Sequence, residues 1–247
     1  MNGEENRGPA RRSQGREGQA DKTLIIAIDG PAGAGKSTIA RHLARHFGLL
    51  NLETGAMYRA FALKALRAGL PLEQSTALEE LATETSIRLE PGEEENRVLL
   101  DDEDVTGLIR NPTVTDAASR VSVFPAIRAW MVQLQQQLGA AGGVVMEGRD
   151  IGTVVFPHAE VKIFLDAAPE VRGQRRFDQL GQAGQQHTVQ PEEVIRELHA
   201  RDERDRNRAD SPLKPAADAV LLDSTDMTLD EAVAAAEAIV EAKLQQS

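Results

Sequence analysis

The sequence predicts an α/β protein with three layers, in which helices cover both faces of a five-stranded parallel sheet. Two observations carry this prediction. Short apolar runs alternate with longer segments of helical pattern, which is typical of parallel strands joined by crossover helices. A glycine-rich turn at residues 30–35 connects the first apolar run directly to the first helical segment, as in strand–loop–helix phosphate sites.

Five apolar runs supply the expected strands, and each is followed by enough chain for a crossover to the next. These runs are residues 24–28, 49–52, 144–147, 161–165 and 220–222. Helices are expected at about residues 36–47, 55–68 and 229–244, and a further helix is expected to begin at Pro169.

One segment departs from this alternation. Residues 86–90 and 97–100 flank a turn at Pro91-Gly92, which predicts a hairpin. The hairpin falls between the second and third expected strands, so residues of about 70–130 are expected to form an inserted subdomain. Inserts beside a binding crevice often contact the substrate, which makes this one a candidate acceptor-binding subdomain; a decorative insert is the alternative.

Composition narrows the class of protein. The chain has 247 residues, of which 41% are hydrophobic and 27% charged, as in soluble globular enzymes. It has no cysteine, which excludes thiol catalysis and cysteine zinc sites. No apolar run approaches a membrane span or a secretion signal, so a cytoplasmic protein without membrane contact is expected. Residues 1–22 are polar and glycine-rich and are expected to be a disordered tail, which leaves 23–247 as the folded domain.

The charge of the chain argues against nucleic acid as a partner. The formal net charge is −11 and only 3% of residues are aromatic, so neither a basic footprint nor base-stacking platforms are present. Of the 28 basic residues, 22 are arginine, whose planar fork suits two-pronged contact with phosphate. The positions of the arginines therefore decide what the chain binds.

The glycine-rich turn matches the phosphate loop (P-loop) pattern G-x-x-x-x-G-K-[ST], and it has the strand before it and the helix after it that this loop requires. Its glycines let backbone N–H groups converge on phosphate oxygens, Lys36 adds a full charge, and the Ser37 hydroxyl is placed to bind Mg²⁺. The chain is thus expected to have the P-loop nucleoside-triphosphate-binding fold. The expected site comprises Gly30, Pro31, Ala32, Gly33, Ala34, Gly35, Lys36, Ser37 and Thr38.

Several kinds of P-loop protein can be weighed against one another. None of the six lysines follows an asparagine, so the guanine-reading motif of GTPases is absent. Asp166 follows an apolar run, as does the Mg²⁺-holding acid of ATPases, but a strand-end residue before the helix at Pro169 is the favoured interpretation.

A small-molecule kinase must bring two anions together, so it needs several arginines directed at one crevice. The chain has four such sets, in order around the P-loop. They are Arg59; Arg149; Arg172, Arg175 and Arg176; and Arg201 with Arg208. Arg201, Asp205 and Arg208 are spaced i, i+4 and i+7, which predicts one helix face. A solvated, salt-bridged surface is the alternative for the last set.

Between the third and fourth sets lies Gly181-Gln182-Ala183-Gly184-Gln185-Gln186-His187, polar and glycine-rich. This composition suits a short lid, residues of about 172–195, that closes over the donor and excludes water. A plain flexible loop is the alternative.

These residues resemble a known family. The segments IDGPAGAGKST, TGAMYR, TDAASRVSVFP, EGRDIGTVVFP, VKIFLDA and RDERDRNRADSPL make the chain similar to bacterial cytidylate kinases, of the nucleoside monophosphate kinase group, from about Ile25 to Leu244. The resemblance implies transfer of the ATP γ-phosphate to CMP or dCMP with Mg²⁺, giving ADP and CDP or dCDP. A P-loop kinase for UMP, AMP or a non-nucleotide acid is the alternative, and a regulatory ATP-binding module is the alternative from another class.

The resemblance also implies roles for particular residues. Lys36, Arg149, Arg176 and Arg201 would be catalytic, and Arg176 would lie on the ATP phosphates. Arg59 and Arg149 would bind the acceptor phosphate, with Thr54 nearby and Arg201 reaching over. Ser119, Arg128, Asp150 and Arg208 would read cytosine, and Asp205 with Arg201 would contact ribose. A monomer is expected. Glu53 is a departure, because the family usually has Asp there.

His42 and His46 are spaced i, i+4 on the helix after the P-loop, a spacing that suits a metal. The sequence offers no third ligand beside them, so a polar helix face is the favoured interpretation.

Overall fold

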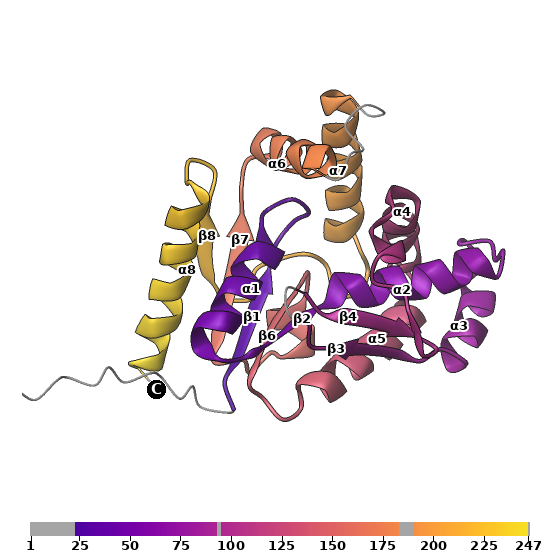
Figure 1. Ribbon diagram of the computed structural model, residues 1–247, viewed down its shortest axis with the longest axis horizontal. Helices are drawn as coiled ribbons and strands as arrows, with labels where there is room; N and C mark the ends of the chain where they lie inside the picture. Colours follow the sequence, from indigo (N-terminus) through magenta and orange to yellow (C-terminus); the bar gives the residue numbers. More distant parts are fainter. Residues whose placement is uncertain (1–22, 93–94, 183–189, 247) are drawn as a thin grey trace, which may run out of the picture.

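The computed structural model describes residues 23–92, 95–182 and 190–246 (Figure 1). The expected tail, residues 1–22, and most of the expected lid turn, residues 183–189, lie outside the described residues. In the described part of the chain, no helix is both long and apolar enough to cross a membrane.

The central sheet has the five parallel strands that the sequence predicts. Its order is β2-β6-β1-β7-β8, with every neighbouring pair parallel. The strands are β1 (Ile25–Asp29), β2 (Leu50–Glu53), β6 (Val144–Gly148), β7 (Val161–Asp166) and β8 (Val220–Asp223). Because β1 is central and Asp29 pairs with both Gly148 and Phe164, the P-loop leaves the sheet between the carboxyl ends of β6 and β7. Ligands bind at this edge in open α/β sheets.

Helices cover the two faces of the sheet, as alternation along β1 requires. Ile26 and Ile28 point to one face, where they are buried against α1 (Lys36–Phe47) and α8 (Leu229–Leu244). Ala27 points to the other face, whose core also contains side chains of α5 (Pro125–Gly139) and of the short helix η2 (Ile151–Val155). The three-layer P-loop fold is therefore confirmed.

The segment between β2 and β6 forms a unit with its own core. The expected hairpin is confirmed by β3 (Ile87–Glu90) and β4 (Arg97–Leu100), and β5 (Glu103–Asp104) extends it to three antiparallel strands. The helical elements are α2 (Thr54–Arg67), α3 (Ser75–Thr83), η1 (Leu108–Arg110), α4 (Pro112–Val121) and α5. Their core includes Phe61 of α2, whose ring centroid lies 5.2 Å from that of Trp130 in α5.

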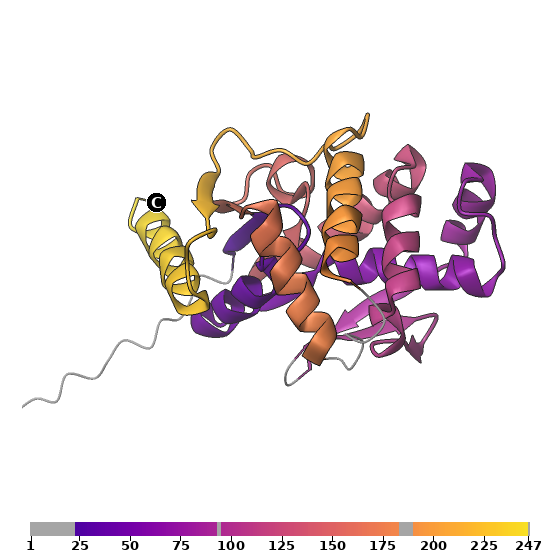
Figure 2. The ribbon, with the colours of Figure 1, turned by 90° about the horizontal axis from the view of Figure 1, so that it is seen from above.

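Two further helices, α6 (Pro169–Gln182) and α7 (Pro191–Arg206), pack against each other. Figures 1 and 2 place this pair between α8 at one end of the molecule and α3 and α4 at the other. Across the intervening space, the Arg204 guanidinium of α7 donates to Asp116 Oδ1 of α4 at 3.4 Å. The P-loop, α2, α4 and α7 thus surround one region above the carboxyl edge of the sheet.

Candidate active site

That region is a cleft of about 870 Å³, and its lining contains most of the residues singled out in the sequence. The predicted residues that line it are Ala32, Gly33, Gly35, Lys36, Ser37, Thr38, Thr54, Arg59, Ser119, Arg128, Arg149, Asp150, Arg176, Arg201, Asp205 and Arg208. Gly30, Pro31 and Ala34 belong to the P-loop but are not part of the lining. Asp166 is also outside it, where its carboxylate accepts from the backbone N–H of Ala167 at 2.8 Å, as expected of a strand-end residue.

The P-loop has the conformation of a phosphate cradle. Gly30 and Gly33 have φ of 151° and 77°, in the region that favours glycine. A side chain at Gly30 is also excluded by space, because a Cβ there would lie 2.0 Å from the Leu165 carbonyl oxygen. Lys36 opens α1 and curls back, donating from Nζ to the Pro31 carbonyl oxygen at 2.8 Å. The loop therefore presents backbone amides, a helix N-terminus and one ammonium group to the cleft.

The charge of the cleft is strongly positive for a buried site. Burial, and then the nearby Arg149, lower the pKa of Lys36 to about 7. Burial and Arg149 likewise lower the pKa of Arg201 to about 9. Five arginines of the cleft lining have a buried guanidinium Nε without a hydrogen-bond partner among the described residues: Arg41, Arg59, Arg128, Arg201 and Arg208. Arg59, Arg128 and Arg208 have carboxylate partners, but buried Lys36 forms no ion pair among the described residues, so the cleft is suited to an anion.

One group of arginines lies next to the P-loop. The Arg149 Nε donates to Asp205 Oδ2 at 2.7 Å, and its Nη1 donates to the Gly148 carbonyl oxygen at 3.2 Å. Arg59 in α2 pairs with Glu53, and Arg59 together with Arg110 holds the pKa of that carboxyl below its ordinary value even though burial raises it. Glu53 thus orients Arg59, so the glutamate, one methylene longer than the aspartate usual in the family, still pairs with this arginine.

A second group lies deeper, toward α4 and α5. Arg128 and Asp150 form an ion pair in which the side chains are 3% and 8% exposed. The Arg128 guanidinium lies 5.9 Å from the centroid of the Tyr58 ring, and Arg208 donates to Ser122 Oγ at 2.9 Å. Ser119 Oγ is buried here with no partner in the described ranges. Donors and carboxylate acceptors therefore lie close together in this part of the cleft.

Asp29, the last residue of β1, fixes the loop that carries Arg149 and Asp150. Its buried carboxylate accepts from the backbone N–H groups of Ile151 at 2.8 Å and Gly152 at 2.7 Å. Burial raises the pKa of Asp29 to about 6, although these two N–H groups act in the opposite direction. The end of the central strand thereby fixes the position of the loop after β6 relative to the P-loop.

The expected helix face of Arg201, Asp205 and Arg208 is wrong in one respect. Helix α7 ends at Arg206, where Asn207 caps it by donating its N–H to the Glu203 carbonyl oxygen. Arg208 therefore lies beyond the helix, and it reaches the cleft because its guanidinium pairs with Asp205 and donates to Ser122. Spacing along a helix could not give the place where the helix stops.

The third arginine set is also only partly directed at the cleft. Arg176 lines it, but Arg172 and Arg175 do not. Arg175 donates to the Ser224 carbonyl oxygen at 2.7 Å. Arg172 is buried, donates to the Ala32 carbonyl oxygen at 2.9 Å and pairs with Asp202 of α7 at 2.5 Å, so it braces the P-loop from behind. Inward-facing arginines on one helix can thus bind either ligand or protein.

We expect Arg172→Met to lower the free energy of unfolding by roughly 3 kcal/mol, because the Asp202 carboxylate would stay buried without its cation. Urea denaturation with a single fluorescence or circular-dichroism probe measures this loss. Arg196→Met, at an exposed position of α7, the helix that carries Asp202, is the matched control and should change stability by less than about 0.5 kcal/mol. Equal free energies of unfolding for the two variants would show that the Arg172–Asp202 ion pair does not stabilise the fold.

Glu147 is a cleft residue that the sequence analysis treated only as the end of a strand. It is buried at the carboxyl edge of β6, and its Oε1 has no hydrogen-bond partner in the part of the chain that the structure describes. Burial and the adjacent Glu53 raise the pKa of Glu147, while Lys36 and a hydrogen bond from Ser37 lower it. The sequence feature that could have indicated Glu147 is that it is the one acidic residue at the end of the apolar run 144–147, which forms the strand next to β1.

The fold and the cleft together define a class of protein. A P-loop on the central strand and a separate arginine cluster open into one cavity, which is the arrangement of a P-loop phosphotransferase.

Comparison with known proteins gives the family. The family model described as Cytidylate kinase matches residues 26–242. A cytidylate kinase of Pelotomaculum thermopropionicum is 51% identical over 209 residues, covering 84% of this chain and 92% of that protein. One of Pasteurella multocida is 45% identical over 213 residues, covering 86% and 93%. Among solved structures, shikimate kinase from Acinetobacter baumannii in complex with shikimate aligns over 92% of this chain and 96% of that one. Its sequence identity is 17% and its TM-score is 0.42, so this likeness is a distant one. The chain belongs to the cytidylate kinase family.

Proposed function

We propose that this protein transfers the γ-phosphate of ATP to CMP or dCMP, giving ADP and CDP or dCDP. The observation that carries the proposal is the single cleft in which the P-loop lysine, Lys36, and the arginine cluster of Arg59, Arg149 and Arg201 lie together. The P-loop takes the donor and the cluster takes the acceptor phosphate. The names of the relatives support cytidylate as that acceptor.

The deeper pocket has the chemistry that cytosine requires. Cytosine offers an amine donor beside two acceptors, so its reader needs a carboxylate and cationic donors together. Asp150 supplies the carboxylate, and Arg128 and Arg208 supply the donors. Ser119, buried with a hydroxyl that has no partner within the described residues, adds a further polar contact. Asp205, which pairs with Arg149 and Arg208, would contact the ribose together with Arg201.

Mg²⁺ fits the donor side of the cleft. Mg²⁺ takes oxygen ligands and keeps several waters, so it needs few protein groups. The Ser37 hydroxyl and the Glu147 carboxylate, with its unpaired buried oxygen, are such groups at the mouth of the P-loop. When bound, the ion would offset the charge of the β- and γ-phosphates.

Positioning and electrostatics account for the reaction without a general base, because the acceptor phosphate is already ionised. Arg149 and Arg201 hold the acceptor oxygen in line with the donor, and Lys36 and Arg176 stabilise the charge on the transferring group. Residues of about 172–195 act as the lid that excludes water, and residues of about 70–130 act as the acceptor-binding subdomain. One chain carries both sites, which supports a monomer; we also propose a cytoplasmic location.

The acceptor is tested by measuring ADP production with Mg-ATP and CMP, dCMP, UMP, AMP or GMP in turn. We expect rapid turnover with CMP and dCMP, weak turnover with UMP and none with the purines. Preference for another acceptor would keep the phosphotransferase and reject the cytosine assignment. ATP binding without turnover on any of the five would favour a regulatory ATP-binding module.

The lowered pKa of Lys36 predicts the pH dependence of ATP binding. In the free protein Lys36 loses its proton above about pH 7, whereas bound phosphates favour the charged form. ATP binding should therefore take up close to one proton at pH 8, and affinity should fall toward tenfold per pH unit above pH 7. Calorimetry in buffers of different ionisation enthalpy measures the uptake. Lys36→Arg keeps its charge and should take up none; equal uptake in both proteins would contradict the prediction.

A further inference from the structure

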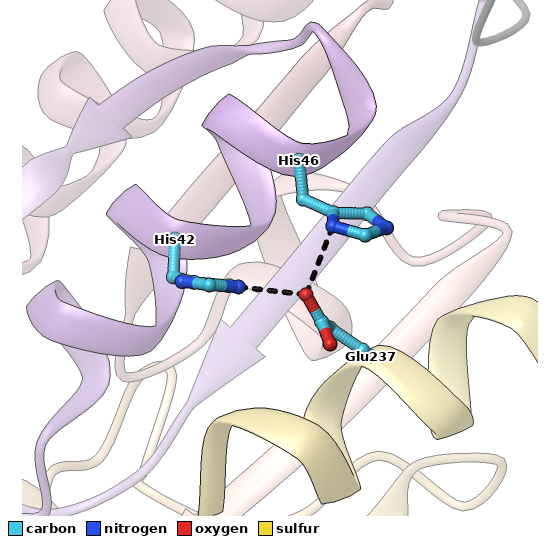
Figure 3. Close-up of side chains that lie close together, drawn as sticks. All are labelled: His42, His46 and Glu237. Atoms are coloured by element: carbon cyan, nitrogen blue, oxygen red, sulfur yellow. Dashed lines mark hydrogen bonds and ion pairs between the residues drawn. The ribbon is translucent and has the colours of Figure 1, made fainter. Parts of the chain in front are cut away.

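We propose that His42, His46 and Glu237 form a binding site for a divalent transition-metal ion, with Zn²⁺ the best match, and that the ion clamps α1 to α8. The three side chains converge from α1 and α8 (Figure 3), and none of them lines the cleft. The site is independent of the proposed phosphotransfer.

The geometry brings three ligand atoms to one point. The carboxylate Oε1 of Glu237 lies 2.6 Å from His42 Nε2 and 3.0 Å from His46 Nδ1. All three ligand atoms lie within 4.8 Å of one another. The histidines are one helical turn apart on α1, with rings stacked at 22° and centroids 6.2 Å apart, and Glu237 comes from the facing side of α8. Two packed helices therefore hold the ligands, and neither depends on a loop.

Little movement is needed to admit an ion. Bonds of about 2.1 Å at tetrahedral angles separate ligand atoms by about 3.4 Å. The pairs that now lie at 2.6 and 3.0 Å must therefore open by less than about 1 Å, and the two histidine nitrogens, which lie within 4.8 Å, must close by at most about 1.4 Å. Both histidine side chains are 45% exposed and Glu237 is 24% exposed, which leaves room for this adjustment. The same exposure lets an ion enter from solvent and keep water as its remaining ligand.

The donor set selects the kind of ion. Two imidazole nitrogens and one carboxylate oxygen suit Zn²⁺, and also Ni²⁺ or Cu²⁺, whereas Mg²⁺ and Ca²⁺ prefer oxygen ligands throughout. Zn²⁺ has no geometric preference from its d-electrons and so accepts the two different ring nitrogens offered here. The chain has no cysteine to compete for the ion. Over the described ranges, this is also the one set of three such ligands that converge.

The position of the site predicts its effect. Alanine and valine side chains of α8, including Ala236 beside Glu237, already pack in the core shared with α1. An ion joining His42 and His46 to Glu237 would add a polar cross-link at the rim of that apolar contact. Because His42 and His46 lie in the second half of α1, away from Lys36 at its start, and neither lines the cleft, the ion should stabilise the fold and leave turnover unchanged.

Isothermal titration of the untagged, metal-stripped full chain with ZnCl₂, without nucleotide or Mg²⁺, tests the proposal. We expect one Zn²⁺ per chain and a rise in Tm that saturates at the same stoichiometry. Co²⁺ in place of Zn²⁺ should give the visible absorption of a low-symmetry cobalt site. His46→Ala and Glu237→Gln should each weaken Zn²⁺ binding at least about tenfold and lose the saturable rise in Tm.

His158→Ala and His199→Ala remove exposed histidines outside the cluster and serve as matched controls, which should bind as the unaltered chain does. His46 and Glu237 lie on helices with partly exposed side chains, and each variant should keep its Tm in the absence of metal to within a few degrees. Failure to bind one Zn²⁺, or equal binding by the His46→Ala, Glu237→Gln and control variants, would overturn the site and leave a hydrogen-bonded contact between α1 and α8.

Discussion

The Arg149→Ala variant is expected to lose at least about 10³-fold in kcat/KM for CMP while it binds ATP as tightly as the unaltered protein. Arg149 is partly buried in the cleft, where it pairs with Asp205 and lies close enough to Lys36 to lower the pKa of that lysine. Its guanidinium is thus placed to bind the acceptor phosphate and to offset charge on the group in transfer. ATP affinity depends mainly on the P-loop, whose residues this change leaves in place, and it is compared well below pH 7, where Lys36 carries its charge with or without Arg149.

Steady-state kinetics with varied CMP at saturating Mg-ATP measure this loss, and ATP binding is measured separately by calorimetry. Arg120→Ala is the matched control, since Arg120 lies on α4, on the acceptor side, and pairs with Glu73 at the surface. Arg149→Lys keeps the charge without the fork and should recover only part of the activity. Turnover in Arg149→Ala like that of the control would remove Arg149 from the mechanism.

The Asp150→Asn variant is expected to change the choice of acceptor, lowering the ratio of kcat/KM for CMP to that for UMP by about 10³-fold. The carboxylate of Asp150 can only accept hydrogen bonds, as the amine of cytosine requires. Asparagine has the same shape but also donates, which suits the carbonyl that uracil has at that position. The change also takes the negative partner from buried Arg128, so activity with CMP should fall more than activity with UMP rises.

Parallel assays with CMP and UMP measure the ratio directly. Asp116→Asn makes the same chemical change at a surface position of α4 and is the matched control. The Tm of both variants shows whether the fold is intact. An unchanged ratio in Asp150→Asn would assign the reading of the base to other residues.

Much of the fold is local in origin and could therefore be predicted. Apolar runs bounded by turn residues predicted the five strands. The sequence motif at residues 30–37, between an apolar run and a helical segment, predicted the P-loop. The order β2-β6-β1-β7-β8 could not be obtained in this way, because strand neighbours depend on how helices pack across the sheet. The same order explains why Glu147 faces Ser37, which nothing in the spacing of the two residues indicates.

The side-chain partners were the least predictable part. The sequence places Arg172 and Arg176 four residues apart, yet one is held by Asp202 behind the P-loop and the other lines the cleft. Arg208 reaches the cleft from beyond the end of a helix, and Glu237 joins His42 from 195 residues away in the chain. Such contacts are fixed by tertiary packing, which a pattern of spacings along one element does not contain.

The most direct test of the central claim is to follow the phosphoryl group itself by ³¹P NMR, with purified protein, Mg-ATP and CMP. We predict that CDP and ADP appear in equal amounts without inorganic phosphate, and that Arg149→Ala purified in the same way forms neither at a comparable rate. Inorganic phosphate formed with ADP and without CDP would mean that the group goes to water, and it would contradict the assignment of the arginine cluster to an acceptor.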